Sequence, residues 1–179
     1  MSKVTIHMVS SLDGFIANEE GTIDWMRSTD SYEEGVALTE DYINEFLKSI
    51  DCYVMGSKTY EHAVELGWAY GDTPVVVLTN RDLKAFKESV EFYSGDPRNL
   101  ASQLRSKFQN IWMVGGSETT KDFLKHKLVD EIVVTFMPIL LGGGKLFFDY
   151  IGSEIKLHLK DTTAFNDGMV ELTYQVLKV

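Results

Sequence analysis

The segment from Ile111 to Thr119 most constrains the fold, because it runs from an apolar strand through two glycines into a helix. The four apolar residues 111–114 are typical of a strand that is covered on both faces. Gly115 and Gly116 follow, and Ser117 is a suitable N-cap for the helix. Such a junction lets the backbone approach a ligand, and the helix N-terminus beyond it attracts anions. The alternative is a structural turn that only needs positive φ.

A second junction of the same kind occurs earlier in the chain. Residues 51–55 are expected to form a strand, and Gly56-Ser57-Lys58-Thr59 turns it into a helix that ends at Gly67. Residues 73–81 give the clearest strand, whose continuous β-branched run predicts burial on both faces. A shorter strand, 90–93, follows, and Asp96-Pro97 should begin the next helix.

The N-terminal part combines one strand, one polar loop and one helix. Residues 4–9 are predicted as a strand that ends in the turn 10–14. The apolar island 15–17 either holds this loop down or forms a wall of a binding site, and composition favours the first. Residues 35–50 are predicted as a helix with one broad apolar face. Glu40 lies at the margin of that face, so it could reach a pocket wall or remain solvated.

The C-terminal part is predicted to contain strands without helices. Residues 129–141 are strand-like, Gly142-Gly143-Gly144 forms a flexible turn, and residues 155–160 and 169–177 should pair as an antiparallel hairpin. Neither a phosphate-binding P-loop nor the G-x-G-x-x-G fingerprint is present. Strands alternating with helices over most of the chain predict an α/β fold, with a mostly parallel sheet and an antiparallel C-terminal edge.

Composition narrows the function classes. The 179 residues fit one domain, 1–179, and a net charge of −10 disfavours a nucleic-acid or anionic-membrane surface. No long apolar run or signal sequence is apparent, so we expect a cytoplasmic protein. Cys52 is the only cysteine, and its apolar neighbours favour a buried, inert thiol. The four histidines are scattered, so we expect no metal site.

Four motifs in this order resemble the dihydrofolate reductase-like fold. They are S-L-D-G-F-I-A at 11–17, V-M-G-S-K-T-Y-E at 54–61, V-G-G-S at 114–117 and P-I-L-L-G-G-G-K-L-F at 138–147. The first and last resemble most closely the C-terminal reductase domain of the bifunctional riboflavin-biosynthesis deaminase/reductase. The resemblance covers nearly the whole chain. It implies a three-layer α/β fold, with helices on both faces of the sheet, and a reductase that uses NADPH.

The resemblance also implies roles for individual residues. The nicotinamide would contact the first strand and the island, and the adenosine ribose with its 2′-phosphate would contact the second junction and the end of the third strand. The pyrophosphate would lie at the Gly115-Gly116 turn, whose glycines are joined by a cis peptide in folate reductases. The implied cofactor-binding residues are Val9, Ile16, Ala17, Gly56, Ser57, Lys58, Thr59, Leu78, Thr79, Asn80, Arg81, Val114, Gly115, Gly116, Ser117 and Thr119.

The substrate side of the resemblance is less regular. Folate reductases carry an acid on the helix after the first loop, and alignment points either to Glu40 or to Tyr42. Thr135 stands where they keep a pterin-linked threonine. The chain has neither the length nor the cysteines for the zinc deaminase of the bifunctional enzyme. Glu40, Tyr42 and Thr135 are therefore the candidate catalytic residues.

These observations lead to one functional hypothesis. We expect NADPH to reduce a small heterocycle, such as the ribosylamino-pyrimidine of riboflavin biosynthesis. A dihydrofolate reductase-type pterin reductase and a non-catalytic nucleotide-binding module without the substrate acid are the alternatives. Related reductase domains pair, so we also expect a homodimer, held by the apolar residues 136–141 and 147–148, which could instead complete the monomer core.

Overall fold

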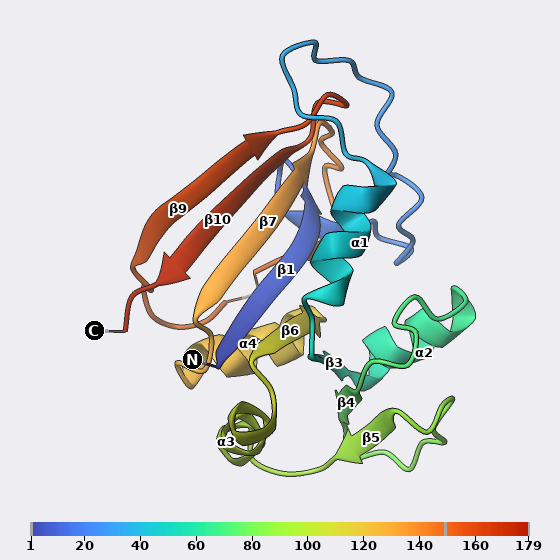
Figure 1. The fold of residues 1–179 in the computed structure, drawn as a ribbon, viewed down its shortest axis with the longest axis vertical. Helices are drawn as coiled ribbons and strands as arrows, with labels where there is room; N and C mark the ends of the chain where they lie inside the picture. Colours follow the sequence, from blue (N-terminus) through green and yellow to red (C-terminus); the bar gives the residue numbers. More distant parts are fainter. Residues whose placement is uncertain (1, 149, 179) are drawn as a thin grey trace.

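The computed structural model describes residues 2–148 and 150–178, and its centre is an eight-stranded sheet in the order β5-β4-β3-β6-β1-β7-β10-β9 (Figure 1). The strands from β5 to β7 run parallel, whereas β10 and β9 are antiparallel to their neighbours. The strands are β1 (Lys3–Ser11), β3 (Cys52–Gly56), β4 (Val75–Leu78), β5 (Val90–Tyr93), β6 (Asn110–Gly115), β7 (Glu131–Met137), β9 (Leu157–Ala164) and β10 (Val170–Val176). The predicted fold class, with its antiparallel C-terminal hairpin, is confirmed.

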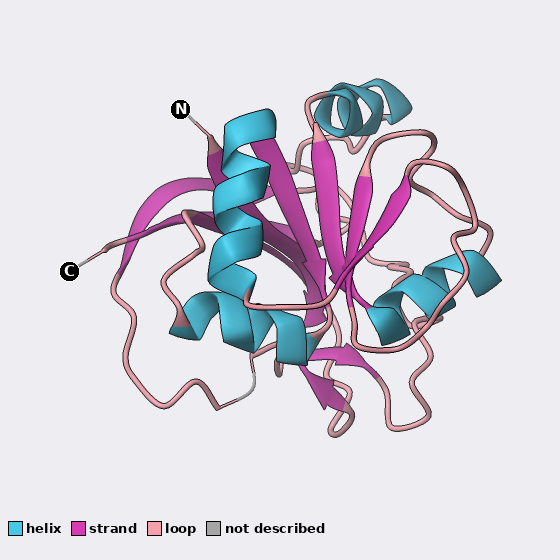
Figure 2. Cartoon of the chain, turned by 90° about the horizontal axis from the view of Figure 1, so that it is seen from below, coloured by secondary structure: helices cyan, strands magenta, loops and turns pink. Residues whose placement is uncertain are grey.

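Helices cover both faces of this sheet, as Figure 2 shows. They are α1 (Glu40–Lys48), α2 (Ser57–Glu65), α3 (Pro97–Lys107) and α4 (Ser117–Lys125). The even residues of β1 pack with the buried side chains of α3 and α4 in one core cluster. On the opposite face, Tyr60 of α2 packs against Tyr53 and Met55 of β3. The predicted three-layer arrangement is therefore present.

Two predicted helix starts were wrong. The first helix begins at Glu40 rather than at residue 35, because Val36 bridges to Phe165 at the hairpin turn, and the Thr39 side chain accepts a hydrogen bond from the Tyr42 N–H group. The last helix is capped by Gly116, so Ser117 is its first residue and not its N-cap. In contrast, α3 begins as predicted, with Asp96 accepting from Arg98 N.

The strand boundaries also differ from the predictions. β7 ends at Met137, before Pro138, which has no N–H group to donate to a neighbouring strand. β9 extends to Ala164, beyond the predicted end at residue 160, because it pairs with β10 as far as Val170. β6 is not covered equally on its two faces, since Ile111 and Met113 are buried but Trp112 and Val114 are half-buried. β4 is buried on both faces, as predicted.

The island 15–17 forms a short strand of its own. It is β2 (Phe15–Ala17), which pairs with β8 (Lys145–Leu146) in a separate two-stranded sheet. Phe147 N also donates to Gly14 O over 2.7 Å. The first and last sequence motifs therefore lie in contact beside the carboxyl end of β1, a proximity that their separation along the chain hides.

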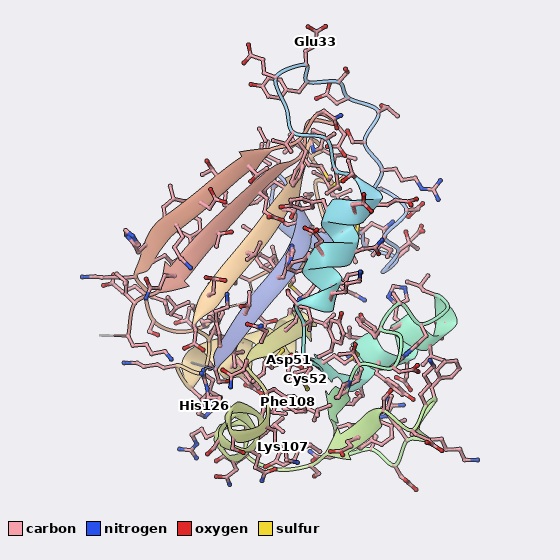
Figure 3. The ribbon with its side chains drawn as sticks, in the orientation of Figure 1. Glu33, Asp51, Cys52, Lys107, Phe108 and His126 are labelled. Atoms are coloured by element: carbon pink, nitrogen blue, oxygen red, sulfur yellow. The ribbon has the colours of Figure 1, made fainter. Side chains whose placement is uncertain are left out.

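The opposite end of the sheet is held by charged groups and contains the only cysteine. Asp130 accepts hydrogen bonds from Val4 N, Arg105 and Lys178. Burial raises the pKa of this carboxyl, but the three hydrogen bonds outweigh burial and hold the pKa below its usual value. Cys52 is buried at the start of β3, near the end of α3 (Figure 3), and burial raises the pKa of its thiol to about 12. The predicted buried, inert thiol agrees with this placement.

Candidate functional site

The carboxyl ends of β3 and β6 carry two helix N-termini side by side. The strands are parallel neighbours, with Met55 in register with Gly115. β3 continues through Gly56 into α2, and β6 continues through Gly116 into α4. Neither helix has a side-chain hydrogen bond at its N-cap. The first N–H groups of both helices, and the positive ends of both helix dipoles, are therefore available at one edge of the sheet.

The two glycines keep the space between these helix N-termini open. A Cβ atom on Gly56 would lie 2.7 Å from Thr119 Oγ1, and one on Gly116 would lie 3.4 Å from Thr59 Oγ1. Each helix thus directs a hydroxyl toward the glycine that caps the other. Ser57 and Ser117, the first residues of the two helices, are half-buried. Backbone N–H groups and hydroxyls that converge on a space without side chains suit a phosphate or diphosphate group.

Gly115 has a different role from Gly116. Its φ is +115°, and an added Cβ would overlap the Met8 methyl group under the sheet edge. Gly116 has an extended conformation, with φ −72° and ψ −162°, which other residues can adopt. The peptide between the two glycines is cis, as the resemblance implied. Both readings of the glycine pair therefore apply, one to each residue: Gly115 needs positive φ, and Gly116 faces the open space.

The end of β4 contributes the polar residues that the sequence suggested. Thr79 Oγ1 accepts from Arg81 N at 3.0 Å, and Asn80 accepts from Ser94 at 2.6 Å. The Arg81 guanidinium donates two hydrogen bonds to Glu61 of α2, both 2.7 Å long. These bonds lower the pKa of Glu61 and raise that of Arg81. Arg81 is thus engaged by a carboxylate, which sequence reasoning missed, although both residues lie in the predicted region.

The remaining residues of the predicted cofactor site divide between this edge and the strands behind it. Lys58 is exposed in the first turn of α2, and Leu78 is half-buried at the end of β4. Val114 and Val9 are half-buried on β6 and β1. Ile16 packs against the core, and Ala17 is buried. The carboxyl edge therefore brings together the Gly56 and Gly116 junctions and the end of β4, with the β2 island beside the carboxyl end of β1.

Asp13 connects the two loops at this edge. Its carboxylate accepts from Ser11 Oγ at 2.6 Å, Leu141 N at 3.1 Å and Gly142 N at 2.8 Å. The hydrogen bond from Ser11 is the main reason why the pKa of Asp13 is lowered. Ser11 Oγ in turn accepts from Phe15 N at 2.9 Å. This carboxylate thus adds to the β2–β8 pairing that joins the first and last motifs, a contact that the sequence does not reveal.

The three candidate catalytic residues lie apart. Glu40 is exposed in the first turn of α1, and Tyr42 is 43% exposed with its ring 6.0 Å from that of Phe165. Thr135 is buried in β7 and donates to Glu171 of β10 over 2.8 Å. Burial, followed by the nearby Glu171 carboxylate, raises the pKa of Tyr42. Thr135 is therefore hydrogen-bonded to Glu171, a residue that sequence reasoning missed, and the charge of Glu171 also acts on Tyr42.

Within residues 2–148 and 150–178, we find no group of three or more acidic, histidine or cysteine side chains that could hold a metal ion. The helices of the same ranges are too short or too polar to cross a membrane.

Comparisons with known proteins identify the family. The family model described as RibD C-terminal domain matches residues 2–171. The protein named "Uncharacterized protein YwjB" of Bacillus subtilis (strain 168) is 35% identical over 176 residues, which cover 96% of this chain and 97% of that protein. A crystal structure of a Shewanella sp. PV-4 protein, named "Putative riboflavin biosynthesis protein", has a TM-score of 0.84 at 26% identity, covering 98% of this chain and 99% of that one.

More distant structures share the fold. The deaminase/5-amino-6-(5-phosphoribosylamino)uracil reductase of Thermotoga maritima has a TM-score of 0.70 at 16% identity, and 98% of this chain covers 57% of that one. Dihydrofolate reductase of Enterococcus faecalis, in complex with NADP(H), has a TM-score of 0.63 at 20% identity, with 98% of this chain and 97% of that one covered. The family model matches residues 2–171, which is nearly the whole chain. This protein therefore belongs to the RibD C-terminal domain family.

Proposed function

We propose that this protein is an NADPH-dependent reductase of a small nitrogen heterocycle, with a ribosylamino-pyrimidine as the substrate class. The observation that carries the proposal is the pair of helix N-termini that lie side by side at Gly56 and Gly116. A dinucleotide carries several phosphate groups, and this edge offers two neighbouring helices whose first N–H groups have no side-chain partner at the N-cap. Family membership and the NADP(H) complex of the related dihydrofolate reductase fold agree with this choice.

The groups along this edge suit a dinucleotide whose adenosine end lies at α2 and β4 and whose nicotinamide end lies at β1 and β2. The N–H groups that open α4, together with Ser117 and Thr119, would hold the pyrophosphate. Those that open α2, with Lys58, Thr79, Asn80 and Arg81, would hold the adenosine ribose and its 2′-phosphate. Val9 and the β2 island would contact the nicotinamide, which supplies a hydride when it is bound. The protein would orient the two rings and exclude water between them.

The test is a calorimetric titration with NADPH and NADH at equal ionic strength. We expect NADPH to bind about tenfold or more tightly, because Lys58 and Arg81 can make charge-assisted contacts with the 2′-phosphate. Lys58→Ala should reduce this preference. Lys87→Ala is the matched control, because Lys87 pairs with Asp72 at 2.7 Å, away from this edge. Equal wild-type affinities for the two dinucleotides would refute the assignment of the 2′-phosphate site.

A pterin reductase is the second candidate, because Thr135 stands where folate reductases keep a pterin-linked threonine and suits a flat, hydrogen-bonding ring of either substrate class. Steady-state oxidation of NADPH with a panel of pyrimidines and pterins would decide between them. If the protein binds NADPH but does not oxidise it with any of these substrates, the non-catalytic nucleotide-binding module would be favoured.

We also propose a cytoplasmic homodimer. The apolar residues suggested for its interface divide in the structure: Phe147 is buried and Phe136 packs against the core, whereas Ile139, Leu140 and Phe148 are exposed. Pro138 is exposed as well, so these four residues are the ones best placed to contact a partner. Light scattering at micromolar concentration should give twice the chain mass, and a monomer mass would reject the proposal.

A further inference from the structure

Three polar side chains form a connected cluster on the face of the sheet where α1 lies. Thr135 Oγ1 donates to Glu171 Oε2 at 2.8 Å, and His7 Nε2 lies 3.3 Å from the same oxygen. The residues come from three adjacent strands, β7, β10 and β1. They are well shielded from solvent, because the Glu171 and His7 side chains are 18% and 15% exposed. An ionised carboxylate at such low exposure needs specific partners.

The position of this cluster relates it to the cofactor edge. Val9 is in register with Thr135, and Thr135 is in register with Glu171. Side chains of directly opposed residues point to the same face, so these three form one row across the sheet. Glu171 is therefore two strands, or roughly 10 Å, from Val9, where we propose that the nicotinamide lies. A ring-sized substrate spans this separation.

The aromatic rings of α1 and β6 flank the cluster on one side. The His7 ring stacks on Trp112 at 5.0 Å and meets the edge of Phe46 at 4.9 Å. In Figure 1, α1 lies in front of β1, whereas no helix lies in front of β7, β10 and β9. All but one of the residues of β9 are exposed. Glu171 thus lies where the sheet emerges from under α1.

The hydrogen-bonding capacity of Glu171 is only half used. The hydrogen bond from His7 is the main reason why the pKa of this carboxyl is lowered, and Thr135 contributes as well, so the group is ionised. Both partners engage Oε2. Across residues 2–148 and 150–178, no hydrogen bond reaches Oε1. Oε1 is not among the buried atoms that lack a partner, so it is open to solvent, and N–H donors of a bound ligand can replace water there.

We propose that Glu171, oriented by Thr135 and His7, is the acid that binds the substrate ring, and that its Oε1 accepts N–H donors of an aminopyrimidine. It would take the place of the acid that folate reductases carry on the helix after the first loop. This inference rests on the proposed reductase function and adds the recognition of the substrate to it. A ring that lacks N–H donors would leave Oε1 without a partner and would bind weakly.

The experiment measures binding of two pyrimidines by calorimetry, with and without NADPH. 2,4-Diaminopyrimidine offers N–H donors, and 2,4-dimethoxypyrimidine has the same ring without them. We expect Glu171→Gln to weaken binding of the diamino compound about tenfold or more, because a charge-assisted hydrogen bond is lost. The dimethoxy compound should bind weakly to both proteins. Asp161→Asn, on the exposed neighbouring strand β9, is the matched control and should change binding less than about twofold.

Two further measurements separate the possible failures. Thermal unfolding checks that Glu171→Gln folds, and if it does not, Glu171→Asp retains the charge and retracts it by one methylene, which should weaken binding of the diamino compound in the same direction. The NADPH affinity should be unchanged in all variants. Unchanged diaminopyrimidine affinity in Glu171→Gln, no binding to the wild type, or equal binding of the two pyrimidines would each overturn the inference. Failure of the wild type to bind NADPH would instead overturn the proposed function.

Discussion

Gly116→Ala should weaken dinucleotide binding about ten- to a hundredfold and leave the stability of the fold within about 1 kcal/mol of the wild type. The backbone at Gly116 is extended, and the added methyl group would meet only Thr59 Oγ1, at 3.4 Å. Replacing a glycine N-cap by alanine costs ~0.5–1 kcal/mol. The reduced freedom of the unfolded chain returns ~0.4–1 kcal/mol, so the two effects nearly cancel.

The effect on binding is larger because of where the methyl group would lie. It would occupy the space between the N-termini of α2 and α4, where an anionic oxygen would otherwise receive N–H hydrogen bonds. Losing one such charge-assisted contact costs ~1.5–3 kcal/mol, which corresponds to about ten- to a hundredfold in affinity.

Gly115→Ala is the matched control, and the opposite result is expected. The φ of +115° costs ~1–2 kcal/mol for a residue with a side chain, and the overlap with the buried Met8 methyl group costs ~1–3 kcal/mol more. Thermal unfolding without ligand should therefore show a fall in Tm of about 5–15 °C for this variant. Calorimetric titration with NADPH completes the comparison. Wild-type affinity in Gly116→Ala would mean that the glycine pair is only a structural turn, and the dinucleotide site would then rest on the Gly56 and Thr79 segments.

Three further predictions concern charges and the thiol. Glu61→Gln should free Arg81 for a 2′-phosphate and raise affinity for NADPH about threefold without changing that for NADH, whereas an equal change for both dinucleotides in calorimetry would contradict this role. Cys52 should not react with a thiol reagent at pH 8 until denaturant is added, because burial raises its pKa to about 12, and rapid reaction of the native protein would show that the thiol is accessible. Asp130 has a lowered pKa in the folded protein, so its contribution to stability is present above pH ~4 and is lost as the pH falls through the pKa of the folded state. Asp130→Asn should therefore lower the stability at pH 7 and also reduce the loss of stability in acid. Denaturant titration at several pH values measures both.

The features that the sequence predicted well are those determined by local pattern. The burial of β4 on both faces follows from its unbroken apolar run, and Asp96-Pro97 begins a helix through its own hydrogen-bonding chemistry. The glycine junctions at Gly56 and Gly116 are also local, so they could be interpreted as anion sites before the structure was known. Their position side by side follows from the parallel pairing of β3 with β6.

The features that could not be predicted depend on contacts between distant segments. Residues 35–39 have the apolar spacing of a helix, but Val36 pairs with Phe165, which is more than a hundred residues away. Asp13 holds Leu141 and Gly142, and Arg81 holds Glu61, through side chains whose partners no spacing rule identifies. In each case, tertiary hydrogen bonds determine the role of a residue whose local pattern allows several.

Local sequence pattern explains the position of Glu40, whereas tertiary contacts explain the role that we propose for Glu171. Glu40 and Asp41 both lie in the first turn of α1 and Lys48 lies in the last, which is the charge distribution that stabilises a helix dipole. The sequence position of Glu40 is therefore explained without a ligand. In the sequence, Glu171 is only an acid in a strand with an alternating pattern. The β7–β10 register places it beside Thr135, and the hydrogen bond from His7 lowers its pKa, so that it is ionised. Alignment to a helix acid directs attention to α1, whereas the carboxylate that we propose for substrate binding is the half-buried Glu171 on the C-terminal hairpin.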